Sequence, residues 1–122
     1  YTTVFGTRKQ ELLRLEHFTE EIGEGSNHCM AVHIPASARR EEQCLISKLP
    51  VWNEKVQSMV LDFKGRRICA SAKNFQLCQE ERPDEVVCQH GKIGKDTFGL
   101  DFRYPLSVIQ AFGIAMTTMT WI

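Results

Sequence analysis

The chain has 122 residues, enough for one domain with a hydrophobic core that needs neither disulfides nor metal. Lys and Arg together number 15, as do Asp and Glu, so the net charge is zero. This balance excludes attraction of the whole molecule to nucleic acid, and any anion site has to be local. The chain begins at Tyr1 without a signal or transit peptide, and we expect it to be a fragment of a longer protein.

Five cysteines are present, at Cys29, Cys44, Cys69, Cys78 and Cys88. Their odd number and the lack of paired spacings argue against a secreted disulfide framework. We therefore expect reduced, partly buried thiols in a cytosolic or nuclear protein.

The first third of the chain is predicted to form two strands. The mostly alternating run LLRLEHF at 12–18 and the short apolar run CMAVHI at 29–34, closed by Pro35, have strand patterns. Between them, EEIGEGSN at 20–27 predicts a turn on its glycines and Asn.

The middle of the chain is predicted to contain a charged loop followed by a hairpin. ARREEQ at 38–43 is the solvated loop, and PVWN at 50–53 opens the next unit. SMVLDF at 58–63 predicts a strand, 64–65 a hairpin-like turn, and 67–78 the second arm.

Two further strands, 86–90 and 97–102, follow the turn EERPD at 80–84. The sequence GKIGKDT between them resembles a phosphate-binding loop only superficially. That motif needs a glycine where Gln89 stands and Ser or Thr where Asp96 stands, so a polar hairpin turn is predicted. The strands at about 2–102 therefore predict an antiparallel, mainly β fold.

The pattern changes after Pro105, a residue suited to a helix N-terminus. Nothing from Tyr104 to Ile122 carries a side-chain charge, and the run LSVIQAFGIAMTTM is apolar on every side. A transmembrane anchor is the alternative to a buried helix, but a spanning helix needs about 20 mostly apolar residues and this run is diluted by Pro, Ser, Gln, Gly and Thr. We expect a buried helix over about 105–118 with the sheet curled around it.

No residue pattern indicates an enzyme. Gly-x-Ser-x-Gly is absent, and no cysteine is marked as a nucleophile. His28, Cys29 and His33 lie close in sequence, but in a strand only Cys29 and His33 would share a face, so no metal site is expected. His17 and His90 are interpreted as sheet-surface residues. Catalytic residues, cofactors and metals are thus all expected to be absent.

The stretch FKGRRICASAKNFQ at 63–76 concentrates positive charge. Its four cations are Lys64, Arg66, Arg67 and Lys73. One interpretation is an anion or partner groove. The other is a solvated hairpin, favoured for Lys64 and Arg67. In that hairpin the inward-packing residues would be Phe63, Ala70, Ala72 and Phe75.

The same stretch closely resembles the signature of the tubby family, Phe-basic-Gly-Arg-Val-Thr-x-Ala-Ser-Val-Lys-Asn-Phe-Gln. The matching positions are Phe63, Gly65, Arg66, Ala70, Ser71, Lys73, Asn74, Phe75 and Gln76. Further matches follow in family order, namely PVWN before it and then Pro83-Asp84, Gln89-x-Gly91, Phe98-x-Leu100-Asp101, Tyr104-Pro105-Leu106, Gln110-Ala111-Phe112 and Ile114-Ala115. This collinear agreement identifies the chain as a member of the family, and Arg67, Ile68, Ala72 and the ending at 117–122 mark a divergent one.

The resemblance implies a closed antiparallel β-barrel threaded by the apolar C-terminal helix. Residues 1–122 would be the C-terminal portion of a single tubby domain, and hence a partial barrel. An incomplete barrel leaves unpaired strand edges. The remaining strands are therefore expected elsewhere in the parent protein.

The resemblance also implies a non-enzymatic adaptor that binds phosphatidylinositol bisphosphate head groups and tethers cargo to membranes. Cations beside an anionic membrane gain about 1 kcal/mol each. The family's principal lipid-binding segment, Ile-Gly-Lys-Leu-Arg, has no counterpart here. One further basic contact corresponds to Lys9, beside Arg8. Arg66 and Lys73 match family positions and are the remaining candidates.

Two other functions remain open. A divergent family member that also carries WD repeats and a SOCS box is similar at its C-terminus, which implies substrate recognition for a cullin-RING ubiquitin ligase without lipid binding. Transcription-related DNA binding comes third, because the chain is neutral and has no recognisable DNA-reading helix. The expected location is the cytoplasm, at the periphery of the plasma membrane or the cilium, with the nucleus as an alternative.

Overall fold

The computed structural model of the 122-residue chain describes residues 2–5, 11–22, 25–38 and 40–120. The strands are β1 (Thr2–Phe5), β2 (Glu11–Ile22), β3 (Gly25–Ile34), β4 (Gln43–Ser47), β5 (Val51–Asn53), β6 (Ser58–Val60), β7 (Phe75–Gln79), β8 (Arg82–Gly94) and β9 (Thr97–Phe102). One α-helix, α1 (Val108–Thr117), follows and continues into a short 3-10 turn, Thr118–Thr120. The predicted mainly β architecture with one C-terminal helix is confirmed.

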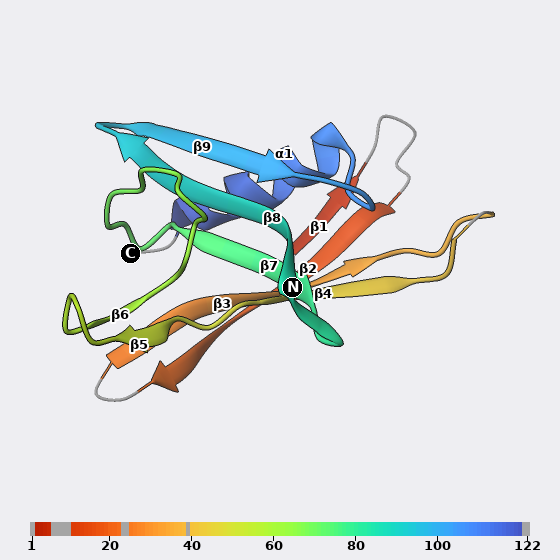
Figure 1. The fold of residues 1–122 in the computed structure, drawn as a ribbon. Coiled ribbons are helices and arrows are strands. Elements are labelled where there is room, and N and C mark those ends of the chain that lie inside the picture. The colour runs from red at the N-terminus through yellow and green to blue at the C-terminus, as the bar shows by residue number, and fades with distance from the viewer. Residues whose placement is uncertain (1, 6–10, 23–24, 39, 121–122) are drawn as a thin grey trace.

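Seven strands form one antiparallel sheet in the order β1-β2-β3-β4-β7-β8-β9, and β5 and β6 form a separate hairpin between β4 and β7. The sheet is open, since no pairing joins β1 to β9 among the described residues. Figure 1 shows the curled sheet with α1 between β9 and β1, and α1 contacts both of these edge strands as well as β2. This arrangement agrees with the expected partial barrel.

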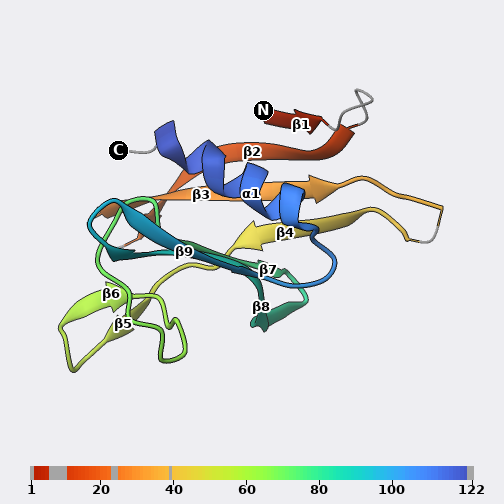
Figure 2. The ribbon, with the colours of Figure 1, turned by 90° about the horizontal axis from the view of Figure 1, so that it is seen from above.

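Figure 2 shows α1 lying across one face of the sheet, and the hydrophobic core lies between the two. Its side chains alternate along the strands, so that Leu13 and Leu15 of β2 are both fully buried while Arg14 between them is exposed. The buried cluster consists of Leu13, Leu15, Met30, Val32, Ile34, Leu45, Phe75, Leu77, Val87, Cys88, Leu106, Ala111 and Ile114. One apolar layer therefore holds the sheet and helix together.

The helix begins with a capping box. Ser107 is the N-cap residue, its hydroxyl accepts from the Gln110 backbone N–H at 3.2 Å, and the Gln110 side chain accepts from the Ser107 backbone N–H at 3.0 Å. The helix thus starts three residues later than Pro105. None of the described helices is long and apolar enough to cross a membrane.

The expectation that α1 is buried all round is wrong. Its inward face buries Gln110, Ala111, Ile114 and Ala115. The opposite face is exposed and apolar, and we call it the outer face of α1. It consists of Val108, Ile109, Phe112 and Met116. The described sheet covers only one side of the helix, which is why uniform apolar composition did not lead to uniform burial.

Several strands are longer than predicted, and one was not predicted. β2 and β3 extend through most of the region expected as a turn at 20–27, because paired strands outcompete its turn residues. β4 was not predicted, since only Leu45 among its five residues is buried. β8 starts at Arg82, within the predicted turn at 80–84. β9 is confirmed, but the turn predicted over GKIGKD is limited to residues 95–96, because β8 continues to Gly94.

The predicted second arm at 67–78 is wrong over its first two thirds, residues 67–74. Only Phe75–Gln79 is a strand, and residues 61–74 form an irregular segment with a turn at Lys64–Gly65. Lys64 and Gly65 have φ angles of 55° and 85°, which turn the backbone out of the extended form. We call residues 61–74 the signature loop.

The five cysteines are all free, as expected for reduced thiols. Cys29, Cys78 and Cys88 are buried, whereas Cys44 and Cys69 are exposed. Burial raises the pKa of the Cys88 thiol to about 12, with the Asp101 carboxylate adding to the effect. Cys88 is therefore a neutral core side chain.

Candidate functional site

The signature loop lies against β8, held by the Asn74 side chain and one backbone bridge. The Cys69 N–H donates to the Lys92 carbonyl at 2.7 Å. The Asn74 amide donates to the Cys69 carbonyl at 2.8 Å, and its oxygen accepts from the Lys92 N–H at 2.9 Å. Asn74 thus supplies the hydrogen bonds that a further strand would have made to β8.

Two paired glycines make room for the loop. Gly91 of β8 and Gly99 of β9 are register partners. A Cβ at Gly91 would lie 2.5 Å from Ile68 Cδ1, and a Cβ at Gly99 would lie 2.5 Å from Arg66 Nη2. A side chain at Gly91 would therefore push Ile68 outward, whereas one at Gly99 would displace only the flexible end of the exposed Arg66 side chain.

Beneath the loop, a row of polar side chains crosses three strands, and we call it the polar row. Gln76 of β7 is paired with Gln89 of β8, which is paired with Asp101 of β9. Gln76 Nε2 donates to Gln89 Oε1 at 3.0 Å, and Gln89 Nε2 donates to Asp101 Oδ2 at 3.0 Å. Arg66 Nε closes the row with an ion pair to Asp101 Oδ2 at 3.0 Å.

The polar row also anchors the start of the signature loop. Gln76 is fully buried and donates from Nε2 to the Asp62 backbone carbonyl at 2.8 Å. Its neighbour Leu77 points to the opposite, helix-facing side of the sheet. The loop therefore forms a second layer on the face opposite α1, joined to the sheet by these hydrogen bonds and by the packing of Ile68 on Gly91.

The depression beside the polar row has balanced charge. It encloses about 310 Å³ and is lined by Lys64, Asp84, Val86, Val87, Gln89, Asp101, Phe102 and Arg103. Two cations thus face two carboxylates, which leaves no net positive potential to concentrate an anion. Lys64 itself lies 3.9 Å from the Asp62 carboxylate in an exposed pair.

Of the four predicted anion-binding residues, Arg66 and Lys73 lie in the described part of the chain. Arg66 is paired with Asp101. Lys73 lies in the turn before β7, where its carbonyl accepts from His90 Nδ1 at 2.9 Å. Arg8 and Lys9 lie outside the described residues. The packing expected within the loop is half right, because Phe63 and Phe75 are buried whereas Ala70 and Ala72 are exposed.

His90 is not the sheet-surface residue that was predicted. It is 4% exposed and is stacked between Phe75 and Phe98, with ring centroids 5.3 and 4.7 Å away. Since a carbonyl only accepts, Nδ1 carries the proton toward Lys73. Burial lowers the pKa of His90, and the hydrogen bond to the Lys73 carbonyl opposes that effect.

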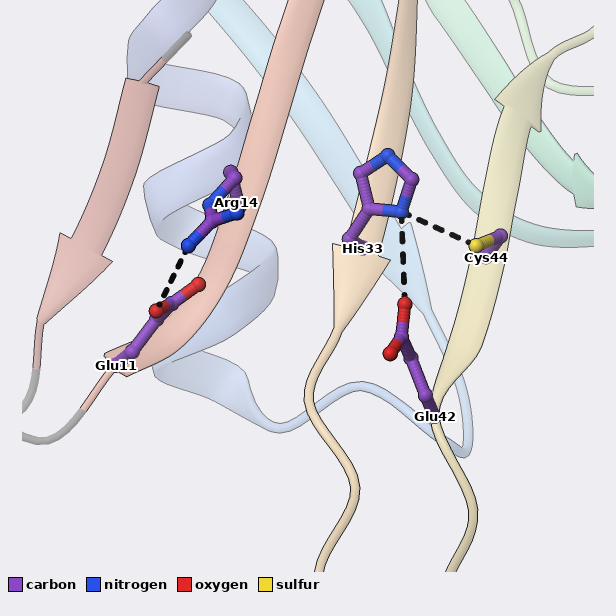
Figure 3. Close-up of polar contacts among 5 residues, drawn as sticks. All are labelled: Glu11, Arg14, His33, Glu42 and Cys44. Carbon is purple, nitrogen blue, oxygen red and sulfur yellow. Dashed lines mark hydrogen bonds and ion pairs between the residues drawn. The ribbon is translucent and has the colours of Figure 1, made fainter.

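A second cluster lies on the outer side of β3 and β4, and sequence reasoning missed it. His33 of β3 and Cys44 of β4 are register partners, with Nδ1 and Sγ 3.2 Å apart. Glu42 Oε1 lies 3.9 Å from the same nitrogen, as Figure 3 shows. Burial raises the pKa of the Cys44 thiol, with Glu42 and Glu81 adding to the effect. Cys44 is therefore not an activated nucleophile.

The register in which β3 pairs with β4 brings this cluster together, and no spacing between residues along the sequence indicates it. Glu42 fell in a segment predicted as a loop, and Cys44 fell in the strand that was not predicted. Cys29, the expected neighbour of His33, is four residues away along one strand, or about 13 Å. One ion cannot span that distance.

Comparison with known proteins agrees with the sequence motif. Residues 7–120 match the model of the Tub family. Over 74 residues, 61% of this chain, the sequence is 54% identical to Tubby protein homolog 1 of Caenorhabditis elegans and 49% identical to Tubby-related protein 3 of Homo sapiens. Protein king tubby 2 of Aedes aegypti is 50% identical over the same length.

The matched segment spans only 17–18% of the length of these relatives. What the relatives do as whole proteins therefore does not transfer directly to the chain. The family model, in contrast, covers residues 7–120, which include β2 to β9, the signature loop and α1. The chain belongs to the Tub family.

Proposed function

We propose that the chain is part of a non-enzymatic tubby-domain adaptor that binds phosphatidylinositol bisphosphate head groups at the membrane periphery and carries protein cargo. The observation that carries this proposal is the match to the Tub family over residues 7–120. The proposed location is the cytoplasm, at the plasma membrane or cilium.

The candidate cations are not equivalent in this proposal. Arg66 is engaged by Asp101, and releasing it would break the end of the polar row, so we assign it to the fold. Arg8 and Lys9 immediately precede β2 and are the remaining basic pair from the family resemblance. We therefore propose that Arg8 and Lys9 supply the contribution of this chain to head-group binding, at about 1 kcal/mol per cation.

Liposome co-sedimentation of the full protein containing this chain tests the proposal. Vesicles with and without phosphatidylinositol bisphosphate are compared at two salt concentrations, since screening weakens exposed charge contacts. Replacing both Arg8 and Lys9 by Ala should reduce pelleting on the lipid-containing vesicles by about tenfold or more in affinity. Lys55→Ala is the matched control, because Lys55 is an exposed cation in the β5–β6 turn.

Pelleting of the folded wild type that depends on the lipid, falls with salt and is weakened only by the Arg8/Lys9 change would support the proposal. No pelleting by a folded protein would contradict it. Equal weakening by Lys55→Ala would contradict the assignment of the contact to Arg8 and Lys9 while leaving general charge attraction in place.

A second candidate function is a protein-interaction module that presents substrates to a cullin-RING ubiquitin ligase. The resemblance to tubby-like protein 4, the divergent family member with WD repeats and a SOCS box, suggests this function. Exposed apolar side chains on the β5–β6 hairpin favour a protein partner, and we call them the hairpin patch. The patch consists of Trp52 of β5 and its register partner Met59 of β6, exposed by 52 and 37%. Exposed Trp and Met side chains are typical of protein interfaces.

The two functions separate experimentally. Trp52→Ala should weaken a protein interaction by about 2 kcal/mol or more if the patch is its centre, without changing lipid pelleting. Pull-down with purified ligase components, compared between wild type and Trp52→Ala, measures this. Loss of lipid pelleting in Trp52→Ala would instead assign the patch to the membrane.

A further inference from the structure

The outer side of β2, β3 and β4 carries a row of chemically active side chains set by strand register. Arg14 is paired with His33, and His33 is paired with Cys44. Their neighbours Leu13, Val32 and Leu45 point into the core, so these three point outward. Glu42, just before β4, brings a carboxylate to the same place (Figure 3).

The donor atoms of His33, Glu42 and Cys44 all lie within 4.8 Å of one another. Tetrahedral Zn²⁺ holds its ligands at about 2.0–2.3 Å, which places neighbouring N, O and S ligands about 3.4–3.6 Å apart. The observed separations from His33 Nδ1, 3.2 Å to Cys44 Sγ and 3.9 Å to Glu42 Oε1, lie on either side of that range. A small rotation of the exposed Glu42 side chain is sufficient to complete the geometry.

The same imidazole nitrogen faces both partners, which a metal site requires of a histidine ligand. Imidazole, thiolate and carboxylate together are ligands that Zn²⁺ accepts, and the thiolate excludes the hard cations Mg²⁺ and Ca²⁺. With Cys44 ionised on binding, Cys44 and Glu42 supply two negative charges to balance the ion. The nearby Arg14 cation is already paired with Glu11 at 3.3 Å, which lessens its repulsion.

The cluster is open on one side. A depression of about 580 Å³ is lined by Glu11, Arg14, His33, Pro35 and Glu42. His33 and Glu42 are exposed by 39 and 63% of their side chains. Three protein ligands with an open fourth position leave room for water or an external ligand.

From this geometry we propose that His33, Glu42 and Cys44 form a Zn²⁺ site that ties the start of β4 to the end of β3. Binding connects two strands and the segment between them, residues 35–42, and so stabilises this part of the sheet. The site is distinct from the polar row and from the proposed lipid contact, so it stands or falls independently of the proposed function.

Zinc binding to the untagged chain, kept reduced, is measured by competition with a chromophoric chelator, and Co²⁺ is added in parallel. The wild type should bind one Zn²⁺ and show the near-ultraviolet charge-transfer band of a thiolate–Co²⁺ bond. Cys44→Ser and His33→Gln should each weaken binding by at least about 10- to 100-fold, the range for losing even an outer-layer partner of a metal ligand. Cys69→Ser, at the other exposed cysteine, is the matched control and should bind as the wild type does.

A second measurement uses the wild-type chain, so that its result does not depend on whether the variants fold. Zn²⁺ should slow alkylation of Cys44 relative to Cys69, both read by mass spectrometry of the same sample. No Zn²⁺ binding by folded wild type, equal binding by Cys44→Ser, or equal alkylation of both thiols with and without Zn²⁺ would each overturn the proposal.

Discussion

Ile68 of the signature loop lies directly against Gly91 of β8. A Cβ at Gly91 would fall 2.5, 3.1 and 3.2 Å from three carbons of the Ile68 side chain. The contact joins a loop without regular structure to the longest strand of the sheet. A missing side chain is therefore what allows the second layer to pack on the sheet.

Replacing Gly91 by Ala should destabilise the fold by about 1–3 kcal/mol, because the added methyl group forces Ile68 outward. Urea denaturation measures the change. Gly94→Ala, at a site of the same strand whose nearest neighbour would be 4.0 Å away, is the control and should be nearly neutral. Adding Ile68→Val, which removes the closest carbon, should recover part of the loss in the Gly91→Ala background. Equal effects at Gly91 and Gly94 would contradict this account.

Within the polar row, Gln76 should matter more than Arg66. Arg66 and Asp101 are 42 and 46% exposed, so Arg66→Ala should cost no more than about 1 kcal/mol. Gln76→Ala leaves the half-buried Gln89 oxygen and the Asp62 carbonyl without their donor, which costs about 1–3 kcal/mol together with a cavity. Chemical denaturation of both variants tests the order, and a larger loss for Arg66→Ala would refute it.

The buried His90 should make stability depend on pH. Because burial lowers its pKa in the folded state, the unfolded chain takes up a proton first as the pH falls. The stabilisation is present above the ordinary histidine pKa of about 6.5 and is lost below it, at up to about 1.4 kcal/mol per pH unit.

His90→Phe should flatten this acid dependence while keeping the stack with Phe75 and Phe98. It also removes the hydrogen bond to the Lys73 carbonyl, at a cost of about 1 kcal/mol at neutral pH. Denaturation curves from pH 5 to 8 provide the measurement. Val56→Ala, at an exposed site that carries no titratable group, is the control and should keep the slope. An unchanged slope in His90→Phe would exclude His90 as its source.

The outer face of α1 should make the 122-residue chain self-associate. Phe112 is 57% exposed in the middle of this face, and apolar patches of this kind associate in water. Phe112→Ser should reduce self-association in analytical ultracentrifugation with little loss of stability. Ile114→Ala, on the buried face, should instead cost about 2–5 kcal/mol. A wild-type chain that stays monomeric would contradict the prediction.

The alternation of apolar and polar residues was sufficient to predict the meander, and the uncharged apolar run after Pro105 was sufficient to predict the C-terminal helix. β9 was located to the residue because Thr97–Phe102 lies between a polar turn and Pro105. The signature loop was not, because its residues resemble a strand while Asn74 and the two glycines pack it as a separate layer. Alternation indicates which side chains of a sheet face the core, and it carries no information on a further layer packed on the outer side of that sheet.

The two candidate sites could likewise be predicted only in part from the sequence. Arg66 was found from the family motif, but its partner Asp101 was only one of several carboxylates that it could have reached. The His33 cluster depends on the pairing of β3 with β4, and a single-residue shift would have turned Cys44 into the core. Register of this kind is a tertiary property.

The hydrogen bond from Gln110 Nε2 to the Leu12 carbonyl, at 2.8 Å, joins positions 98 residues apart. The strands of the meander can pair one after another as the chain is synthesised, but the inner side of β2 has no helix to cover it until residues 108–117 have been made. Loop closure over such a separation is slow compared with hairpin formation. Nascent chains therefore pass through a stage in which Leu13 and Leu15 are not yet covered by α1.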